Sequence, residues 1–355
     1  MLLRQCCRNV NTVRCTLAAW AVTRLIVLAG FAVAAPHGVI GALGHWDGSW
    51  YGSISMHGYQ FVADGKQHNV AFFPLFPMIS SLLIRVGIAW PLAGVIVNNV
   101  AFLIAVLLLY AYVRQTFDVP TARWSAVVAC AIPLSLFCSV AYSEGLFILF
   151  SVAALRCFGR KWFLAAGLAA AAAAATRPLG VALALGLIAG AIVERRKIGE
   201  ILATSTGLIG IAAFAAYCQW RFNDPLAFVH AQLGWRHQTG FDLHGWIRLL
   251  AAAKAFSVHA WITIVFVVVA VPCVIAFRQR IGAAGVAYVI VALATIALAG
   301  TPFSVDRLLY ATVPLLIALA RLFTRAPFVG YVATAFSLPL LFIDAMTFAQ
   351  FHWVA

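Results

Sequence analysis

Acidic side chains are scarce in this chain, since only ten of its 355 residues are Asp or Glu. Asp, Glu, Lys and Arg together make up 10% of the chain, whereas hydrophobic residues make up 64%. A soluble globular domain carries roughly 25% charged residues. The shortage of charge therefore excludes a soluble fold and predicts an all-α polytopic membrane protein with a single domain over 1–355. At roughly 20 residues per span plus loops, this length allows about ten to twelve spans.

The usual signatures of metal sites and of nucleotide binding are also missing. The eight Cys include no CxxC pair, and the nine His form no HxxxH or HxH pair. GxGxxG, P-loop and HExxH motifs do not occur either. We therefore expect no cofactor, although the His leave a divalent metal as an alternative that their spacing does not indicate. We expect no nucleic acid as a partner, because basic cytoplasmic loops explain most of the net charge of +14.

The first apolar segment covers residues 16–35 and contains one charge, Arg24. A charge inside the membrane is costly, so we expect Arg24 to face protein or to reach toward the interface. We predict that this segment is an uncleaved first span. A cleaved signal peptide ending at Ala32-Val33-Ala34 is the alternative, and it leaves the downstream topology unchanged.

Residues 70–89 are apolar enough to be mistaken for a second span. Pro74 and Pro77 near the start, and Arg85 inside, favour a helix at the interface. If 70–89 does not cross, eleven spans follow, with the N-terminus inside and the C-terminus outside. These spans are 16–35, 92–113, 122–142, 144–158, 162–175, 178–193, 198–219, 258–277, 281–299, 308–323 and 327–348.

The distribution of basic residues supports this topology. Fifteen of the 24 Lys and Arg then lie inside, mostly in short loops, where the positive-inside rule is most reliable. They are Arg4, Arg8, Arg14, Arg114, Arg123, Arg156, Arg160, Lys161, Arg195, Arg196, Lys197, Arg278, Arg280, Arg321 and Arg325. Letting 70–89 cross would place nearly all these loops outside.

The same topology gathers the polar chemistry on the outer side. The two large loops, 36–91 and 220–257, both lie outside, and all nine His and seven of the ten acidic residues fall on the outer side or near it. Those seven are Asp47, Asp64, Glu144, Asp224, Asp242, Asp306 and Asp344. We therefore predict a multi-pass integral membrane protein with an extracytoplasmic active site, which faces the periplasm, the cell exterior or a lumen.

The most unusual stretch is His45-Trp46-Asp47-Gly48-Ser49-Trp50-Tyr51, directly after the first span. One interpretation is that Asp47 caps a helix over 48–57 that ends at Gly58, with the aromatic residues as an interfacial belt. The other is that Asp47 carries chemistry. The two are compatible, since one carboxylate oxygen can cap while the other remains free.

Further polar clusters recur at the outer ends of spans. They are Tyr142-Ser143-Glu144, Thr176-Arg177-Pro178, Asn223-Asp224-Pro225 and Asp306-Arg307. A turn or a helix cap explains Asp224 and Asp306 equally well. Glu144 and Arg177 lie within apolar hairpins, where a charge costs a few kcal/mol unless it faces a polar cavity.

Carboxylates and arginines around an outer cavity open to lipid suit a substrate with a phosphate on a lipid. The planar, permanently charged guanidinium binds phosphate oxygens well, and a carboxylate can accept a proton from an attacking hydroxyl. The rings of Trp46, Trp50 and Tyr51 suit the apolar faces of a sugar.

These motifs resemble the PIG-V-like mannosyltransferases, the bacterial relatives of GPI mannosyltransferase 2. The resemblance rests on Trp46-Asp47-Gly48-Ser49-Trp50-Tyr51 with Ile54, Gly58 and Tyr59, and on Phe72-Phe73-Pro74-Leu75-Phe76-Pro77. The other outer clusters, including Asp306-Arg307-Leu308-Leu309-Tyr310, follow in the family's order, so the resemblance covers about residues 15–325. This chain departs from the family in His45, where Arg is usual, and in Ser143, where Thr is usual.

The resemblance implies a GT-C glycosyltransferase, in which 70–89 is an interfacial helix of the first outer loop. Such an enzyme moves a hexose from a polyprenyl-phosphate donor to a glycan, glycolipid or protein acceptor, with inversion of the anomeric centre. We expect the hexose to be mannose, and the donor and the bilayer to be the lipid partners. Asp47 then corresponds to the family's acidic residue in the first outer loop, and we expect it to be catalytic. We add Trp46, Trp50, Tyr51, Glu144, Arg177, Asp224 and Arg307 as substrate-binding residues, with Arg177 and Arg307 on the phosphate. A transporter or flippase of lipid-linked sugars is the alternative function, although the apolar middles of the spans argue against it.

Overall fold

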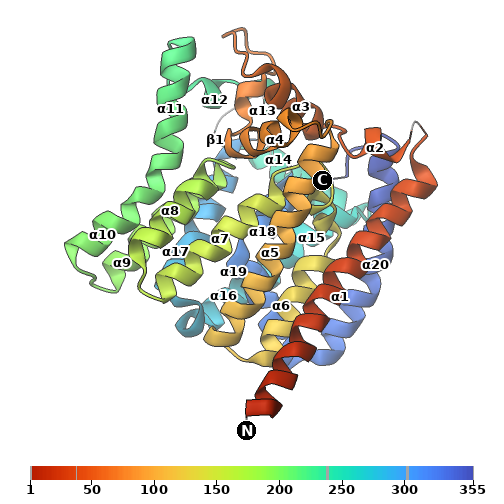
Figure 1. The fold of residues 1–355 in the computed structure, drawn as a ribbon, viewed down its shortest axis with the longest axis vertical. Helices are drawn as coiled ribbons and strands as arrows, with labels where there is room; N and C mark the ends of the chain where they lie inside the picture. Colours follow the sequence, from red (N-terminus) through yellow and green to blue (C-terminus); the bar gives the residue numbers. More distant parts are fainter. Residues whose placement is uncertain (1, 37, 237–239, 301–303, 355) are drawn as a thin grey trace.

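The computed structural model describes residues 2–36, 38–236, 240–300 and 304–354, and the side chains from residue 14 onward except Arg236. Most of the described chain is helical (Figure 1). The helices of the first half are α1 (Leu2–Ala34), α2 (Val39–Ala42), α3 (Asp47–His57), α4 (Leu75–Arg85), α5 (Leu92–Thr116), α6 (Val119–Ala131), α7 (Glu144–Gly159), α8 (Phe163–Ala174) and α9 (Leu179–Val193). Two 3₁₀ turns, η1 (Asn69–Ala71) and η2 (Pro133–Cys138), interrupt them.

The second half contains α10 (Ile198–Ser205), α11 (Ile209–Phe222), α12 (Ala227–His230), α13 (Leu233–Arg236), α14 (Leu243–Lys254), α15 (Val258–Val265), α16 (Val271–Ala276), α17 (Arg278–Ala297), α18 (Val305–Ala311), α19 (Val313–Arg325) and α20 (Pro327–Ala349). A 3₁₀ turn, η3 (Thr206–Leu208), joins α10 to α11, and a π-helical stretch, η4 (Phe266–Ala270), joins α15 to α16. Two short strands, β1 (Gly240–Phe241) and β2 (Ala299–Gly300), pair in parallel.

Fewer helices meet the length of a full span than the sequence predicts. Six helical segments of the described chain are long and apolar enough to cross a membrane, and a seventh is the bent pair α18–α19. The six are Arg14–Ala34, Leu92–Thr116, Ile198–Phe222, Val258–Ala276, Arg278–Ala297 and Pro327–Ala349. The chain is therefore a multi-pass membrane protein. The sequence predicted eleven spans, four more than these seven. The four extra ones correspond to the helices at 119–131, 144–159, 163–174 and 179–193, which have at most 16 residues, below the roughly 20 needed for a straight crossing.

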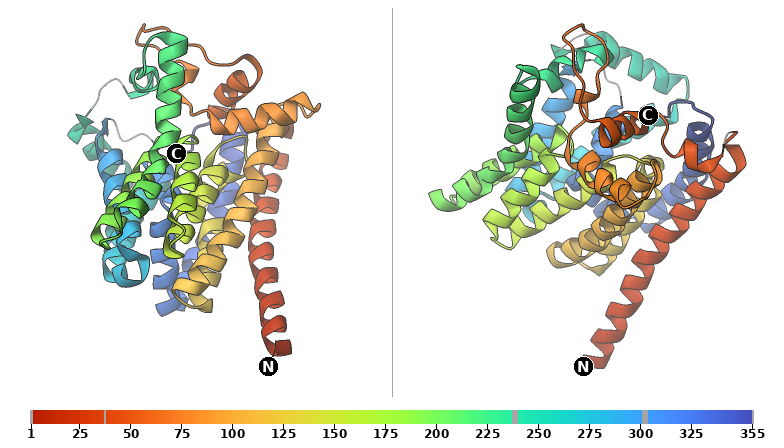
Figure 2. Two further views of the ribbon diagram at one scale, coloured as in Figure 1. Left: turned by 60° about the vertical axis from the view of Figure 1, so that its left-hand side comes forward. Right: turned by 45° about the horizontal axis from the view of Figure 1, so that its top comes forward.

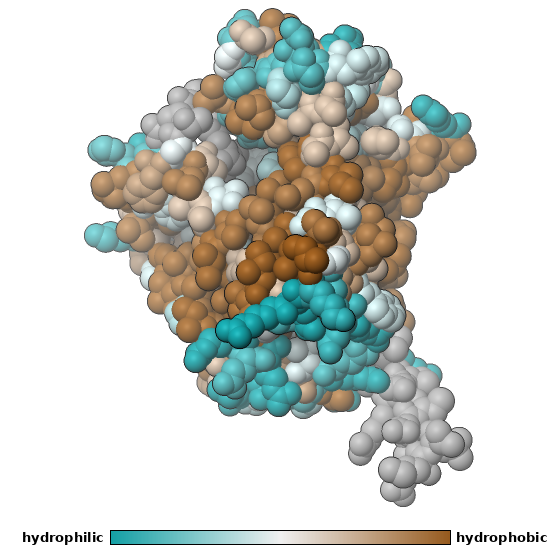
Figure 3. Space-filling model, turned by 90° about the vertical axis from the view of Figure 1, so that its left-hand side faces the viewer, coloured by the Kyte–Doolittle hydropathy of each residue, from teal (hydrophilic) through white to brown (hydrophobic). Residues whose placement is uncertain are grey.

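One end of the bundle carries the predicted inner loops. Arg280 donates to the backbone oxygen of Thr116 at 3.3 Å, Arg160 donates to Gln115 at 3.4 Å, and Arg321 pairs with Asp118 at 2.5 Å. These contacts bring four separate basic loops together at one end. Figure 3 shows hydrophilic surface at both ends of the molecule, with a broad hydrophobic band between them. This arrangement matches a bundle that spans a bilayer.

The opposite end is built from the two large loops. Helices α2, α3 and α4 of the first loop lie there with α12, α13 and α14 of the second (Figure 1). With 11 residues, α4 is too short to cross a bilayer, because each residue adds about 1.5 Å and the apolar core is about 30 Å thick. It runs across the end of α5 (Figure 2, left). The segment 70–89 is therefore not a span, as its prolines and Arg85 predict.

The charge in the first span faces protein. The Arg24 side chain donates to the backbone oxygen of Ser135 at 2.9 Å and to its hydroxyl oxygen at 3.0 Å. Its guanidinium carbon lies 5.1 Å from the centre of the Phe102 ring. Of the two sequence expectations for Arg24, burial against protein is therefore confirmed.

Candidate functional site

Helix α3 presents Asp47, but not through the capping role that one interpretation gave it. The helix begins at Asp47 itself, with Trp46 at the cap position, and no side chain caps its first turn. Trp46 has φ 54°, a positive value that is uncommon outside glycine and marks local strain. The helix ends at Gly58, with φ 78°, as predicted. The Asp47 carboxylate is therefore free of the helix end and turns to a partner from the far end of the chain.

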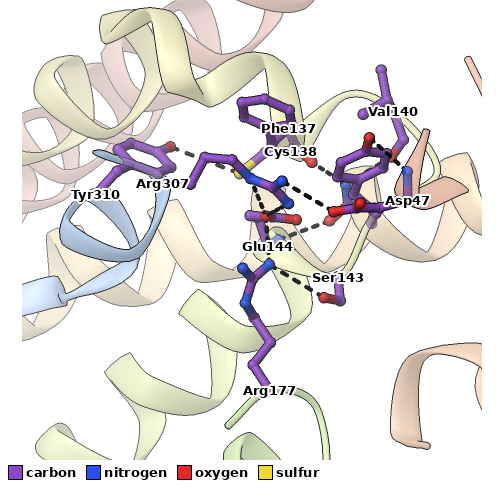
Figure 4. A network of polar contacts seen from close by, with 12 residues as sticks. Asp47, Phe137, Cys138, Val140, Ser143, Glu144, Arg177, Arg307 and Tyr310 are labelled. Carbon is purple, nitrogen blue, oxygen red and sulfur yellow. Dashed lines mark hydrogen bonds and ion pairs between the residues drawn. The ribbon is translucent and has the colours of Figure 1, made fainter. Parts of the chain in front are cut away.

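That partner is Arg307, on the short helix α18. Its Nη1 donates to Oδ2 of Asp47 at 3.0 Å. Its Nε and Nη2 donate to Oε1 of Glu144 at 3.1 and 2.5 Å (Figure 4). The Arg307 and Glu144 side chains are buried, whereas the Asp47 side chain keeps 25% of its surface exposed. Of the two carboxylates, only Asp47 is therefore accessible.

Arg177 also pairs with the Glu144 carboxylate. Its Nη1 forms an ion pair with Oε1 of Glu144 and donates weakly to Oγ of Ser143 at 3.5 Å. The Ser143 hydroxyl lies 2.8 Å from the Tyr51 hydroxyl. Burial raises the pKa of Tyr51 to about 12, against a smaller opposing effect of Arg177. Tyr51 is therefore a neutral phenol that can donate or accept a hydrogen bond.

Close packing of α7 on α5 fixes the position of Glu144. A side-chain carbon on Gly145 would lie 2.4 Å from the backbone oxygen of Asn98, so only glycine fits there. The Asn98 side chain accepts from the Gly145 N–H at 2.7 Å and donates to the backbone oxygens of Phe137 and Val140. Glu144 is thereby held at the first turn of a helix, where the helix dipole favours an anion.

Aromatic rings enclose Arg307. Its guanidinium carbon lies 4.2 Å from the ring centre of Phe137, 5.0 Å from that of Tyr142 and 5.3 Å from that of Trp353. The Tyr142 hydroxyl also accepts from the backbone N–H of Asp47 at 3.1 Å. Cation–π contacts in a desolvated site add to the ion pairs, so this guanidinium is strongly held.

A cavity of about 260 Å³ opens beside this cluster. Asp47, Arg177 and Arg307 line it, and Glu144 does not. The other lining residues are Tyr51, Ala71, Phe72, Phe73, Thr176, Pro178, Leu179, Gln232, Trp235, Thr295, Ile296, Ala299, Ser304, Leu308 and Trp353. The cavity therefore combines two arginines and one accessible carboxylate with aromatic walls from both large loops.

The three aromatic residues predicted to bind substrate divide into one cavity residue and two supporting ones. Tyr51 lines the cavity. Trp46 instead stacks on Phe351, with ring centres 4.6 Å apart, and Trp50 stacks on Phe72 at 6.1 Å. Trp46 and Trp50 thus pack behind the cavity, where they hold residues of its wall.

Asp224 lies outside the cluster. One of its oxygens accepts from the backbone N–H of Leu226 at 3.0 Å, and the other lies 2.7 Å from Nδ1 of His230. Asn223, in the left-handed conformation, ends α11 directly before it. Asp224 does not line the cavity, and these contacts match the turn interpretation rather than the substrate-binding one.

A second polar group behind Arg307 escaped the sequence analysis. Asp306 accepts from the backbone N–H of Arg307 at 2.9 Å through Oδ1, and its Oδ2 lies 2.6 Å from Nδ1 of His259. The other ring nitrogen of His259 is 3.4 Å from Asp344. Sequence placed all these residues on the outer side, but their pairing joins three separate helices and has no local signal.

The last residues of the described chain were also missed. Trp353 lines the cavity and its ring lies edge-on to Trp46 at 5.6 Å. An aromatic residue after a final span is normally read as an interfacial anchor, so only the fold reveals its place in the wall. Among the described residues, no group of three or more His, Cys, Asp or Glu is arranged to hold a metal ion.

Known proteins resemble this chain in sequence. A family model described as "Mannosyltransferase (PIG-V)" matches residues 12–189, which is half of the chain. The GPI alpha-1,6-mannosyltransferase 2 of Homo sapiens is 30% identical over 148 residues, covering 38% of this chain and 29% of the relative. The enzyme of the same name from Mus musculus is 31% identical over 159 residues, covering 41% and 30%. The chain thus spans about 30% of the length of these relatives.

Solved structures resemble it in fold. ArnT from Cupriavidus metallidurans bound to undecaprenyl phosphate matches with a TM-score of 0.57 and 12% identity, over 86% of this chain and 59% of ArnT. The apo oligosaccharyltransferase of Archaeoglobus fulgidus matches with a TM-score of 0.51 and 14% identity, over 96% of this chain and 56% of that one. At this identity the likeness concerns the fold alone.

Proposed function

This chain belongs to the PIG-V mannosyltransferase family and has a GT-C-like fold, and we propose that it transfers a hexose, namely mannose, from a polyprenyl-phosphate donor to an acceptor at the extracytoplasmic face. The acceptor is a glycan, a glycolipid or a protein with a free hydroxyl. The single observation that carries the proposal is the cavity in which the accessible carboxylate of Asp47 and the guanidinium groups of Arg177 and Arg307 meet between aromatic walls.

Asp47 is the general base in this proposal. Arg307 occupies its Oδ2, and among the described residues no group donates to Oδ1. An acceptor hydroxyl at that oxygen loses its proton to the carboxylate as its oxygen bonds to the anomeric carbon. The bond from that carbon to the phosphate oxygen breaks on the opposite face, which inverts the configuration. Base catalysis of this kind is typically worth 10²–10⁴-fold.

Arg177 is the ligand of the leaving phosphate. It lines the cavity and pairs with Glu144 through one nitrogen, which leaves donors of its fork for phosphate oxygens. The phosphate gains a negative charge as the sugar leaves, so a fixed guanidinium stabilises the transition state more than the ground state.

From the sequence, Arg307 was expected on the donor phosphate together with Arg177. In the structure, Arg307 bonds Asp47 directly. With Glu144 on its other side, Arg307 serves mainly to orient the base. Glu144 is fully buried and outside the cavity wall, so it holds the two arginines and is a poor candidate for the base.

An apolar groove beside the cavity supports a donor with a lipid chain. It has a volume of about 930 Å³ and runs between α3, α4, α8 and α11, with Arg85 among its lining residues. Pro74, Leu75 and Ala175 line the groove, and the neighbouring Phe73 and Thr176 line the cavity. A prenyl chain in the groove would therefore leave its phosphate near Arg177. ArnT, a neighbour in fold, was solved with a lipid of this class, undecaprenyl phosphate.

The membrane face follows from charge. The cavity lies at the end of the bundle opposite the basic loops that contain Arg114, Arg280 and Arg321, and such loops favour the cytoplasm. These charges support a cavity on the outer face, and we propose the bacterial inner membrane as its location because the chain resembles the bacterial relatives of this family.

The alternative of a flippase predicts movement of the lipid-linked sugar without chemical change. Its test is purified protein in proteoliposomes with polyprenyl-phosphate mannose and a hydroxyl acceptor. Formation of a mannosylated product with inverted anomeric configuration, read by mass spectrometry and NMR, supports the transferase. Transbilayer movement of intact donor with no product overturns it. Envelope glycans of a deletion strain that lack one hexose, with accumulation of its lipid donor, would identify the acceptor.

A further inference from the structure

The second large loop contributes its own residues to the cavity. Gln232 and Trp235 lie on either side of the start of α13, and both line the cavity with Asp47 and Arg177. The proposed function, with Asp47 as the general base and Arg177 as the phosphate ligand, assigns no role to either residue. Their contacts with the first large loop explain how they reach the cavity wall.

Contacts made by Gln232, Gly234 and Trp235 fix this part of the second loop on the first. The Gln232 amide nitrogen donates to the backbone oxygen of Ala71 at 3.3 Å. The Trp235 ring lies edge-on to Trp50 at 5.6 Å and to Phe72 at 5.7 Å. At Gly234, an added side-chain carbon would lie 2.5 Å from the backbone of Lys66, so glycine is required for this approach. Such packing costs the loop conformational freedom and places one tryptophan at the cavity wall.

We propose that Trp235 is the aromatic platform for a hexose ring and the main determinant of sugar specificity in this cavity. The inference rests on the proposed transferase function and names a residue that this function alone does not require. A sugar ring presents apolar C–H faces and a polar rim. The cavity offers a matching set, because Trp235 supplies a broad apolar surface while Gln232, Asp47 and Arg177 supply hydrogen-bonding groups.

The size of the cavity supports a single ring. Pockets for drug-sized ligands are typically about 300–1,000 Å³, and this one has about 260 Å³. It therefore suits one hexose and the adjoining phosphate rather than an oligosaccharide. Epimers of a hexose differ in which hydroxyls project from the face that meets an aromatic ring, so a ring at the wall can discriminate among them.

The experiment compares full-length variants in proteoliposomes, with steady-state kinetics on polyprenyl-phosphate mannose and on its glucose and galactose counterparts. For Trp235→Ala we expect the KM of the sugar-bearing substrate to rise by about tenfold and the preference for one epimer to fall similarly. For Trp235→Phe, which retains an aromatic ring against Trp50 and Phe72, we expect a smaller loss. Trp220→Ala is the matched control, because Trp220 is 79% exposed on α11 and does not line the cavity.

Gly234→Ala provides an independent test, since it leaves Trp235 chemically intact but forces the loop away from Lys66. We expect the same loss of selectivity as in Trp235→Ala. A rise in donor KM with changed donor selectivity assigns the platform to the transferred hexose, and a rise in acceptor KM alone assigns it to an acceptor sugar. Unchanged KM and selectivity in both variants would overturn the inference. The proposed function fails separately, if the wild-type protein turns over none of these donors.

Discussion

Arg307 donates to Asp47 across 260 positions of sequence, with Nη1 3.0 Å from Oδ2. The contact joins the first large loop to α18, the first helix of the bent pair α18–α19. Because Arg307 is held by Glu144 and by three aromatic rings, it is the rigid member of the pair, and it sets the direction of the more exposed Asp47. The candidate base is thus oriented by the core rather than by its own loop.

Asp47→Asn should abolish most activity without unfolding the protein. Asn is nearly isosteric and its amide oxygen can still accept from Arg307, but it cannot take a proton. We expect turnover to fall at least about a hundredfold, measured as product formed per enzyme with saturating donor. Asp64→Asn is the control, because Asp64 lies in the same loop, pairs with His68 and is outside the cavity wall. Near-wild-type turnover in Asp47→Asn would remove Asp47 from the chemistry.

Arg177→Ala should impair use of the donor more than Arg177→Lys does. Lys keeps the positive charge but loses the planar fork that matches a phosphate. Hydrogen bonds to charged groups are worth about 1.5–3 kcal/mol, so we expect Arg177→Ala to lower kcat/KM for the donor by about tenfold to a hundredfold. Arg160→Ala, an exposed arginine at the opposite end, is the control. Equal kinetics for wild type and Arg177→Ala would refute the phosphate assignment.

Glu144→Gln should be strongly destabilising. The carboxylate is fully buried between Arg177 and Arg307, and its neutralisation leaves two guanidinium groups with less compensation. Breaking a buried pair typically costs about 3–5 kcal/mol. Thermal unfolding in detergent should show a clear fall in Tm for Glu144→Gln.

The comparison for that experiment is Asp118→Asn. Asp118 pairs with Arg321 at the opposite end of the bundle and also caps α6, a role that Asn retains. Its side chain is 40% exposed, and exposed pairs contribute about 0–1 kcal/mol. We expect little change in Tm. If the Tm of Glu144→Gln is as high as that of Asp118→Asn, the stability of the buried cluster does not depend on the charge of Glu144.

Reporter fusions should place the two ends of the bundle on opposite sides of the membrane. Arg114 lies near Thr116, which Arg280 contacts, so a fusion after Arg114 should report the cytoplasm. A fusion after Ala355 should report the outside, because Trp353 lies in the cavity wall. A reporter exposed outside after Arg114, or inside after Ala355, contradicts the assigned orientation.

Sequence predicted the members of the site better than their arrangement. Asp47, Glu144, Arg177 and Arg307 were identifiable because a charge next to an apolar span needs a reason, and all four meet at one place. Their partners were not predictable in the same way. Which arginine faces which carboxylate depends on helix packing, and no local pattern predicted the direct contact between Arg307 and Asp47.

The fold shows the same division. The apolar segments and the short helix at 75–85 follow from composition and from the prolines. The sequence did not predict that residues 119–193 form several helices too short for straight crossings. Hydropathy measures the length of an apolar segment and does not show where a helix ends. Trp235 and Trp353 were missed for a related reason: in a membrane protein an isolated tryptophan first suggests an interfacial belt.

The position of the C-terminal residues has a practical consequence for work with this protein. Trp353 is part of the cavity wall and Phe351 stacks on Trp46 directly before the candidate base. An affinity tag or a truncation at the C-terminus therefore acts on the site itself, whereas a tag at the N-terminus extends from the opposite end of the bundle (Figure 1). Low transferase activity in a C-terminally tagged preparation could therefore be caused by the tag, so kinetics are better measured on protein with an N-terminal tag.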